Sequence, residues 1–187
     1  MNDLIESIRG EYIRYKALAE AALLQVRDDE LETAPAPEGN SVAVICWHVA
    51  GNLQSRFTDF LASDGEKPWR NRDEEFAERT VTRAQLMAKW NDGWAALFGA
   101  LEGLTDAQLH DSVTIRGQSL KVHEALNRSV AHVAYHVGQI VLVAKSLRGA
   151  GWRSLSIPRH GSAAYNQQPR SEKPAAHAAA LTPPDRD

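Results

Sequence analysis

The stretch AHVAYHVGQIVLVAK, residues 131–145, places two imidazoles in an otherwise apolar segment with helical character. Residues four apart in an α-helix lie about 40° apart around the axis and about 6 Å apart along it, so His132 and His136 face one direction. Two imidazoles in this arrangement can bind one metal ion. A zincin protease needs glutamate directly after the first histidine as its general base, but residue 133 is valine. A zincin site is therefore excluded.

A third ligand must come from another element, because two protein ligands hold a metal weakly. His48 lies on the apolar side of a helix predicted to begin at residue 42. His123 is two and a half turns before His132 and points to the opposite side of its helix. The other histidines fall in predicted loops or in the C-terminal segment: His110, His160 and His177. His48 is thus the inward-facing histidine that a second helix supplies.

Each histidine taken alone has a simpler interpretation, a core histidine that is hydrogen-bonded to a neighbour. Burying three imidazoles without a cation needs three separate partners, whereas one divalent ion satisfies all three. Three histidines also leave a coordination position for water or substrate, as a catalytic site requires. Asn52, one turn after His48, and Gln139, three residues after His136, are predicted either to orient a ligand or substrate or to be polar residues on an exposed face.

Amphipathic helices are predicted to position these residues. Apolar residues recur at spacings of three and four over residues 3–26, 42–61, 83–102 and 120–148. Ser41, Thr82 and Ser119 are the predicted N-caps, and Thr82 forms a capping box with Gln85. Residues 111–118 alternate weakly and predict a short extended segment or hairpin before the last helix. The predicted fold class is all-α, a four-helix bundle whose topology these patterns leave open.

Two segments do not fit regular core elements. SDGEKPWRNRDEEFAERT, residues 63–80, is polar and interrupted, and is predicted to be a long connection of the kind that often carries function. From about residue 150 the chain becomes rich in proline and alanine. Residues 1–166 are therefore predicted to form one domain, and residues 167–187 a disordered tail.

Composition limits the classes of function. The 187 residues carry a formal net charge of −3, which gives no electrostatic argument for binding nucleic acid or an anionic membrane. The N-terminal residues do not form a signal peptide, and no stretch predicts a membrane span. Cys46 is the single cysteine, which excludes an intramolecular disulfide and Cys-rich zinc motifs. A cytoplasmic location is expected.

With His48 in CWHVAGNLQSRF and the pair in AHVAYHVGQIVLVAK, the sequence resembles the DinB-like (DinB/YfiT) metalloenzyme family. It is most similar to a bacterial subgroup of unassigned function in which DGEKPWRNRDEEF and NRSVAHVAYHVGQIV recur, and the resemblance covers residues 1–166. It implies an up-down-down-up four-helix bundle that is a homodimer. It further implies that His48, His132 and His136 bind zinc, nickel, iron or manganese, since imidazole suits several of these metals.

Characterised relatives are thiol-dependent transferases and isomerases that use bacillithiol, mycothiol or glutathione. The resemblance implies a metal-dependent thiol S-transferase or hydrolase that acts on a small-molecule substrate, with a low-molecular-weight thiol as cosubstrate. The alternative is a non-catalytic, metal-binding stress-response module. A DNA-damage nuclease fits poorly, because the chain is acidic and lacks the carboxylate clusters that hold two metals.

The DGEKPWRNRDEEF segment is a feature of this subgroup. Arg70 and Arg72 are predicted to contribute to a lid or a surface that recognises an anionic small molecule, since guanidinium binds carboxylates well. In the alternative interpretation, Trp69 anchors a solvated loop to the bundle.

Overall fold

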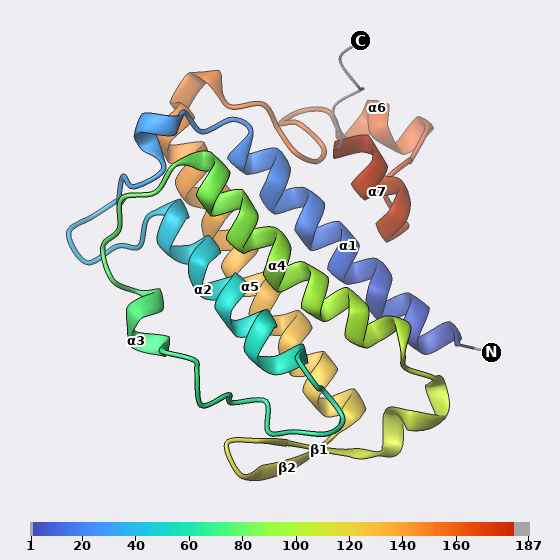
Figure 1. The fold of residues 1–187 in the computed structure, drawn as a ribbon. Coiled ribbons are helices and arrows are strands. Elements are labelled where there is room, and N and C mark those ends of the chain that lie inside the picture. Colours follow the sequence, from blue (N-terminus) through green and yellow to red (C-terminus); the bar gives the residue numbers. More distant parts are fainter. Residues whose placement is uncertain (1, 182–187) are drawn as a thin grey trace.

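Long helices form the bundle that positions the histidines (Figure 1). In the computed structural model, which describes residues 2–181, they are α1 (Asp3–Leu23), α2 (Val42–Phe57), α4 (Arg83–Glu102) and α5 (Val122–Arg148). Figure 1 shows α2 and α4 running in the same direction, opposite to α1 and α5, so the topology is up-down-down-up. Helix α2 packs against α4 and α5, and α1 against α5 and α4. The predicted all-α four-helix bundle is confirmed.

Parallel neighbours cannot be joined by a tight turn, so α2 and α4 need a long connection. Residues 58–82 supply it and contain a single helical turn, α3 (Arg72–Glu75). The other connections contain the short 3-10 helices η1 (Asp28–Glu30), η2 (Asp106–His110) and η3 (Gly149–Gly151). The predicted extended segment is a hairpin of β1 (Ser112–Ile115) and β2 (Gln118–Lys121), which leads directly into α5.

Two of the three predicted N-caps are present. The Ser41 hydroxyl accepts a hydrogen bond from Val44 N at 3.2 Å, and Thr82 and Gln85 form a capping box at α4. The prediction for Ser119 is wrong, because this residue pairs with Thr114 in the hairpin. Helix α5 starts later, and its Glu124 side chain accepts a hydrogen bond from Lys121 N at 2.7 Å.

Helices α2 and α4 approach closely where Gly93 faces Ala50, two residues after His48. A Cβ atom at Gly93 would lie 2.6 Å from the carbonyl oxygen of Ala50 and 2.7 Å from its Cα. Both contacts are with backbone, so the two helices would have to separate. A Cβ atom at Gly99, on the same helix, would have no heavy atom of another described element within 4 Å.

This difference predicts opposite effects of the same substitution. Gly93→Ala is expected to lower the free energy of unfolding by ~1–3 kcal/mol, as overpacking does. Gly99→Ala is expected to raise it by up to ~1 kcal/mol, because alanine has the higher helix propensity. Urea denaturation of both variants measures the difference. Equal stabilities would contradict the close packing of α2 on α4.

The C-terminal segment contains two short helices in the part that the structure describes. Residues 168–181 of the predicted disordered tail contain α7 (Pro174–Leu181), which lies along α1, and α6 (Ser162–Gln167) precedes it (Figure 1). The side chain of His177 lies 3.1 Å from the carbonyl oxygen of Leu155. Pro174, the first residue of α7, packs beside Gly10 of α1, and the alanines that follow it are strong helix formers. Residues 182–187 lie outside the described part.

One stretch of the described chain, Val122–Gly151, is long and apolar enough to cross a membrane by length and composition, with a mean hydropathy of 1.2. Core helices of globular proteins pass the same test. Here the stretch corresponds mainly to α5, which packs against α1 and α2. It therefore has the contacts of a bundle helix.

Candidate metal centre

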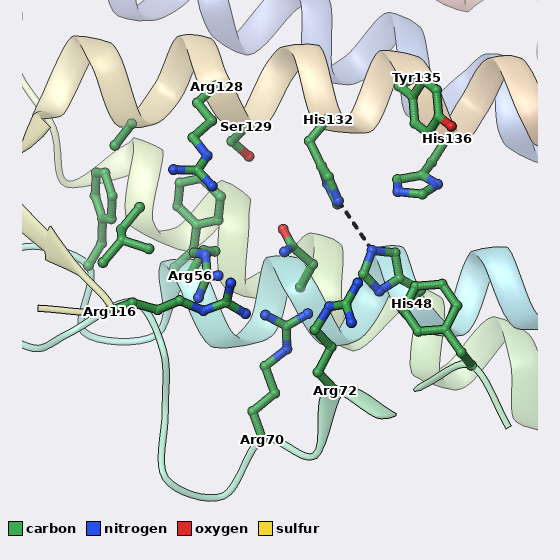
Figure 2. A pocket seen from close by; sticks show the side chains of 16 residues that line it. His48, Arg56, Arg70, Arg72, Arg116, Arg128, Ser129, His132, Tyr135 and His136 are labelled. Atoms are coloured by element: carbon green, nitrogen blue, oxygen red, sulfur yellow. Dashed lines mark hydrogen bonds between the residues drawn. The ribbon is translucent and has the colours of Figure 1, made fainter. Parts of the chain in front are cut away.

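The predicted histidines meet between α2 and α5, near the middle of both helices. His48 points from α2 toward His132 and His136 on α5 (Figure 2). One ring nitrogen from each residue lies within 4.8 Å of those of the other two, and Nε2 of His48 is 3.2 Å from Nε2 of His132. For comparison, nitrogens bound to one zinc ion in a tetrahedron lie roughly 3.3 Å apart. The arrangement is placed to bind a metal ion.

Hydrogen bonds fix which nitrogen faces the centre in two of the three rings. Nδ1 of His48 lies 2.8 Å from Glu75 Oε2, and Nδ1 of His136 lies 2.7 Å from Gln139 Oε1. Carboxylate and amide oxygens accept hydrogen bonds, so each Nδ1 carries the proton and each Nε2 presents a lone pair. Metal-binding histidines are commonly oriented in this way by a partner on the other nitrogen.

His132 shows why the three rings alone do not satisfy one another. Its Nδ1 is buried and has no hydrogen-bond partner among the described residues. In one tautomer of His132, Nε2 carries the proton and donates it to Nε2 of His48, and the buried Nδ1 is left as an acceptor without a donor. In the other tautomer, Nδ1 carries the proton, and the lone pairs on Nε2 of His132 and Nε2 of His48 face each other. Either tautomer leaves a buried nitrogen unmatched, which costs free energy. A cation between the rings would accept both of the lone pairs that face each other, so the three histidines fit a metal ion.

Burial keeps the two α5 imidazoles neutral. Desolvation is the largest cause that lowers the pKa of His132 to about 3, and the neighbouring imidazoles of His136 and His48 lower it further. Desolvation also lowers the pKa of His136, against the hydrogen bond to Gln139, which raises it. Neutral imidazole is the form that coordinates metals, so these side chains are ready to bind at neutral pH.

Glu75 positions His48 and was not among the predicted site residues. It comes from α3 in the long connection and is 5% exposed, and it accepts hydrogen bonds at 2.8 Å from both Nε and Nη2 of Arg70. Burial raises the pKa of Glu75, but hydrogen bonds from Arg70 and His48 outweigh it, so the pKa is lowered overall. The carboxylate is therefore charged and links the long connection to the metal centre.

A glycine makes room for this carboxylate. A Cβ atom at Gly51, one turn after His48, would overlap the side chain of Glu75. Hydrogen bonds to Asp64 hold the start of the connection in place, because its carboxylate accepts from the backbone N–H groups of Glu66, Arg116 and Gly117 at 2.7–2.8 Å. These bonds tie the connection to the tip of the hairpin, and they lower the pKa of Asp64 to about 2.

The triad opens into a cavity of about 380 Å³ between α2, α3, α5 and the hairpin (Figure 2). This volume is in the range of small-molecule sites. Asn52 lines it together with the three histidines. Guanidinium groups form much of the remaining wall: Arg56, Arg70, Arg72, Arg116 and Arg128. The cavity thus combines three imidazoles that are placed to bind a metal ion with concentrated positive charge.

The other predicted residues fall into distinct positions. The side-chain oxygen of Gln139 lies 2.7 Å from Nδ1 of His136. Arg70 lines the cavity, but its side chain is only 2% exposed and its guanidinium binds Glu75. Arg72 lines the cavity from α3, and its guanidinium lies over the Phe76 ring at 4.9 Å. Trp69 is 56% exposed and does not line the cavity.

Sequence reasoning missed Glu75 and three of the cavity arginines among the described residues. Arg128 could have been found, because it lies four residues before His132 and shares its side of α5. Nothing in the sequence distinguishes Glu75 from the neighbouring acidic residues Asp73 and Glu74. Arg56 could have been found in the same way, because His48, Asn52 and Arg56 follow one another at intervals of four residues along α2. Arg116 reaches the cavity from the turn of the hairpin, which no helical spacing predicts.

A family profile described as a protein of unknown function, DUF1572, matches residues 1–161. The chain belongs to the DUF1572 family. The matched residues include all of α1 to α5 and every residue of the candidate metal centre. The description of DUF1572 names no activity, and no curated protein matches the chain.

A solved structure similar to this DUF1572 chain is the crystal structure of a conserved protein from Enterococcus faecalis. The two have a TM-score of 0.58 and 21% sequence identity, over 80% of this chain and 99% of the other. At this identity the likeness concerns the fold alone. Function must therefore be argued from the site.

Proposed function

We propose that this DUF1572 protein is a metal-dependent enzyme, a thiol S-transferase or hydrolase, with a divalent metal ion held by His48, His132 and His136. The observation that carries the proposal is the convergence of three ring nitrogens within 4.8 Å at the wall of a cavity. A structural metal site is usually closed by four protein ligands, whereas three ligands beside a cavity leave a position for a reactant. Zinc, nickel, iron and manganese all suit imidazole ligands.

The metal ion, when bound, would lower the pKa of a thiol or water and so supply a nucleophile at neutral pH. The protein side chains orient the ligands: Glu75 holds the His48 ring and Gln139 the His136 ring. Asn52 lies on the cavity wall one turn after His48, where its amide can hydrogen-bond a bound reactant. The resemblance of the histidine motifs to the DinB-like family favours a thiol over water.

A thiol-consumption assay tests this proposal. The purified protein is stripped of metal, reloaded separately with zinc, nickel, iron or manganese, and mixed with an epoxide or a chloro-aromatic electrophile. We expect bacillithiol, mycothiol or glutathione to be consumed faster with at least one loaded form than with the metal-free protein. Electrophile loss without added thiol would identify a hydrolase. Absence of turnover with every metal, with and without thiol, would contradict an enzyme and favour the non-catalytic module.

A further inference from the structure

The cavity beside the triad carries more positive charge than its own carboxylates balance. Among residues 2–181, the carboxylates that contact its arginines at 3.5 Å or less are those of Glu66 and Glu75. Glu66 binds Arg56, Arg70 and Arg116 together. Five guanidinium groups among the described residues thus face these two acids. Like charges held in one cavity repel, unless an anion from outside compensates them.

Two of the arginines supply the unbalanced charge. The Arg128 side chain has no hydrogen bond or ion pair with any described residue. The described carboxylate nearest to Arg72 is that of Asp73, at 4.0 Å, and its side chain is 97% exposed. Figure 2 shows Arg128 reaching into the cavity from α5 and Arg72 from α3 on the opposite side. Their guanidinium groups keep free N–H donors, and guanidinium binds carboxylate or phosphate through paired hydrogen bonds.

The spacing along α5 relates this charge to the metal centre. Arg128, His132 and His136 follow one another at intervals of four residues, so each is about 6 Å farther along one side of the helix. An anionic group bound by Arg128 therefore lies about one helical turn from the first α5 imidazole. Apolar side chains also line the cavity, among them Phe57, Phe60, Ile115 and Ala125.

We propose that the cavity binds a small anionic molecule whose carboxylate or phosphate group contacts Arg128 and Arg72 while its reactive end reaches the histidine triad. The volume of about 380 Å³ limits the ligand to the size of a small metabolite. This inference rests on the proposed function for the role of the bound molecule as a reactant. The binding of the anion itself depends on the arginines and is testable without metal.

Isothermal titration calorimetry with two probes tests the proposal. Succinate and inorganic phosphate are titrated separately into metal-free protein, and succinate also into the zinc-loaded protein. The variants are Arg128→Gln and Arg72→Gln, each removing one free guanidinium. Arg159→Gln is the matched control, because Arg159 is exposed before α6 and does not line the cavity. Circular dichroism checks that each variant keeps its helices.

We expect at least one probe to bind the metal-free protein, and its affinity to fall about 10- to 100-fold in Arg128→Gln, as loss of a charge-assisted hydrogen bond predicts. The control should bind like the wild type, and the stronger probe shows whether carboxylate or phosphate is preferred. Binding of neither probe, or equal binding by Arg128→Gln, would overturn the proposal. The proposal would also be overturned if succinate bound only the zinc-loaded protein and with the same affinity in Arg128→Gln, because succinate would then be only a metal ligand. Arginine-dependent binding in a protein that takes up no metal would support the anion site and refute the proposed function.

Discussion

Replacement of His132 by alanine is expected to lower the affinity for a divalent metal ion by more than ~100-fold, because losing a ligand costs more than losing a residue that only orients one. His132 is the most informative of the three ligands to remove. Its Nδ1 has no partner among the described residues, whereas removal of His48 would also remove one hydrogen bond from the buried Glu75 carboxylate. The helical fold should therefore survive the change, and the loss can be assigned to the metal centre.

Competition titration against a chromophoric chelator measures this affinity, and elemental analysis gives the metal content per chain. His123→Ala is the matched control, because it removes an imidazole from the same helix. The His123 ring contacts His110, at 5.9 Å between centroids, and not the triad. Unchanged metal content in His132→Ala would show that the three histidines do not form the metal centre.

The histidines were predictable because, in a regular helix, the position of a residue in the sequence determines the direction in which its side chain points from the helix axis. The spacing of His132 and His136 fixes a common direction on any regular helix. His48 followed from an apolar pattern that α2 reproduces, with the predicted cap at Ser41 in place. The bundle was predictable for the same reason, since long amphipathic helices bury their apolar sides against one another.

The inward-facing side chains of the long connection could not be predicted, because no periodicity governs this segment. Residues 63–80 contain several acids and arginines, and their sequence does not show which of them turn inward. In the structure Glu75 is buried beside His48 while its neighbour Glu74 is exposed. That choice depends on tertiary contacts, including the space at Gly51 and the bonds that Asp64 makes to the hairpin. The predicted N-cap at Ser119 was wrong for a similar reason, because a tertiary contact decides its structure: Ser119 pairs with Thr114 in the hairpin and does not begin the helix.

Replacement of Glu75 by alanine is expected to have the largest effect on stability, a loss of roughly 3–5 kcal/mol in the free energy of unfolding, as for other broken buried ion pairs. The Arg70 side chain is 2% exposed, and without Glu75 its remaining carboxylate contact is Glu66 at 3.5 Å. His48 also loses the acceptor of its Nδ1 proton. Urea denaturation of the metal-free protein measures the loss, and Glu74→Ala, at an exposed neighbouring acid, is the control.

A second substitution separates the two roles of Glu75. In the variant Glu75→Leu with Arg70→Leu neither charge is left alone, so much of the lost stability should return, as it does when apolar side chains replace a buried pair. Metal affinity should stay about 10- to 100-fold below that of the wild type, because His48 still lacks the carboxylate that orients its ring. Recovery of stability and metal affinity together would contradict an orienting role and leave Glu75 as only the partner of Arg70. Recovery of stability alone would assign to this carboxylate both functions that its contacts indicate, neutralising Arg70 and presenting Nε2 of His48 to the metal.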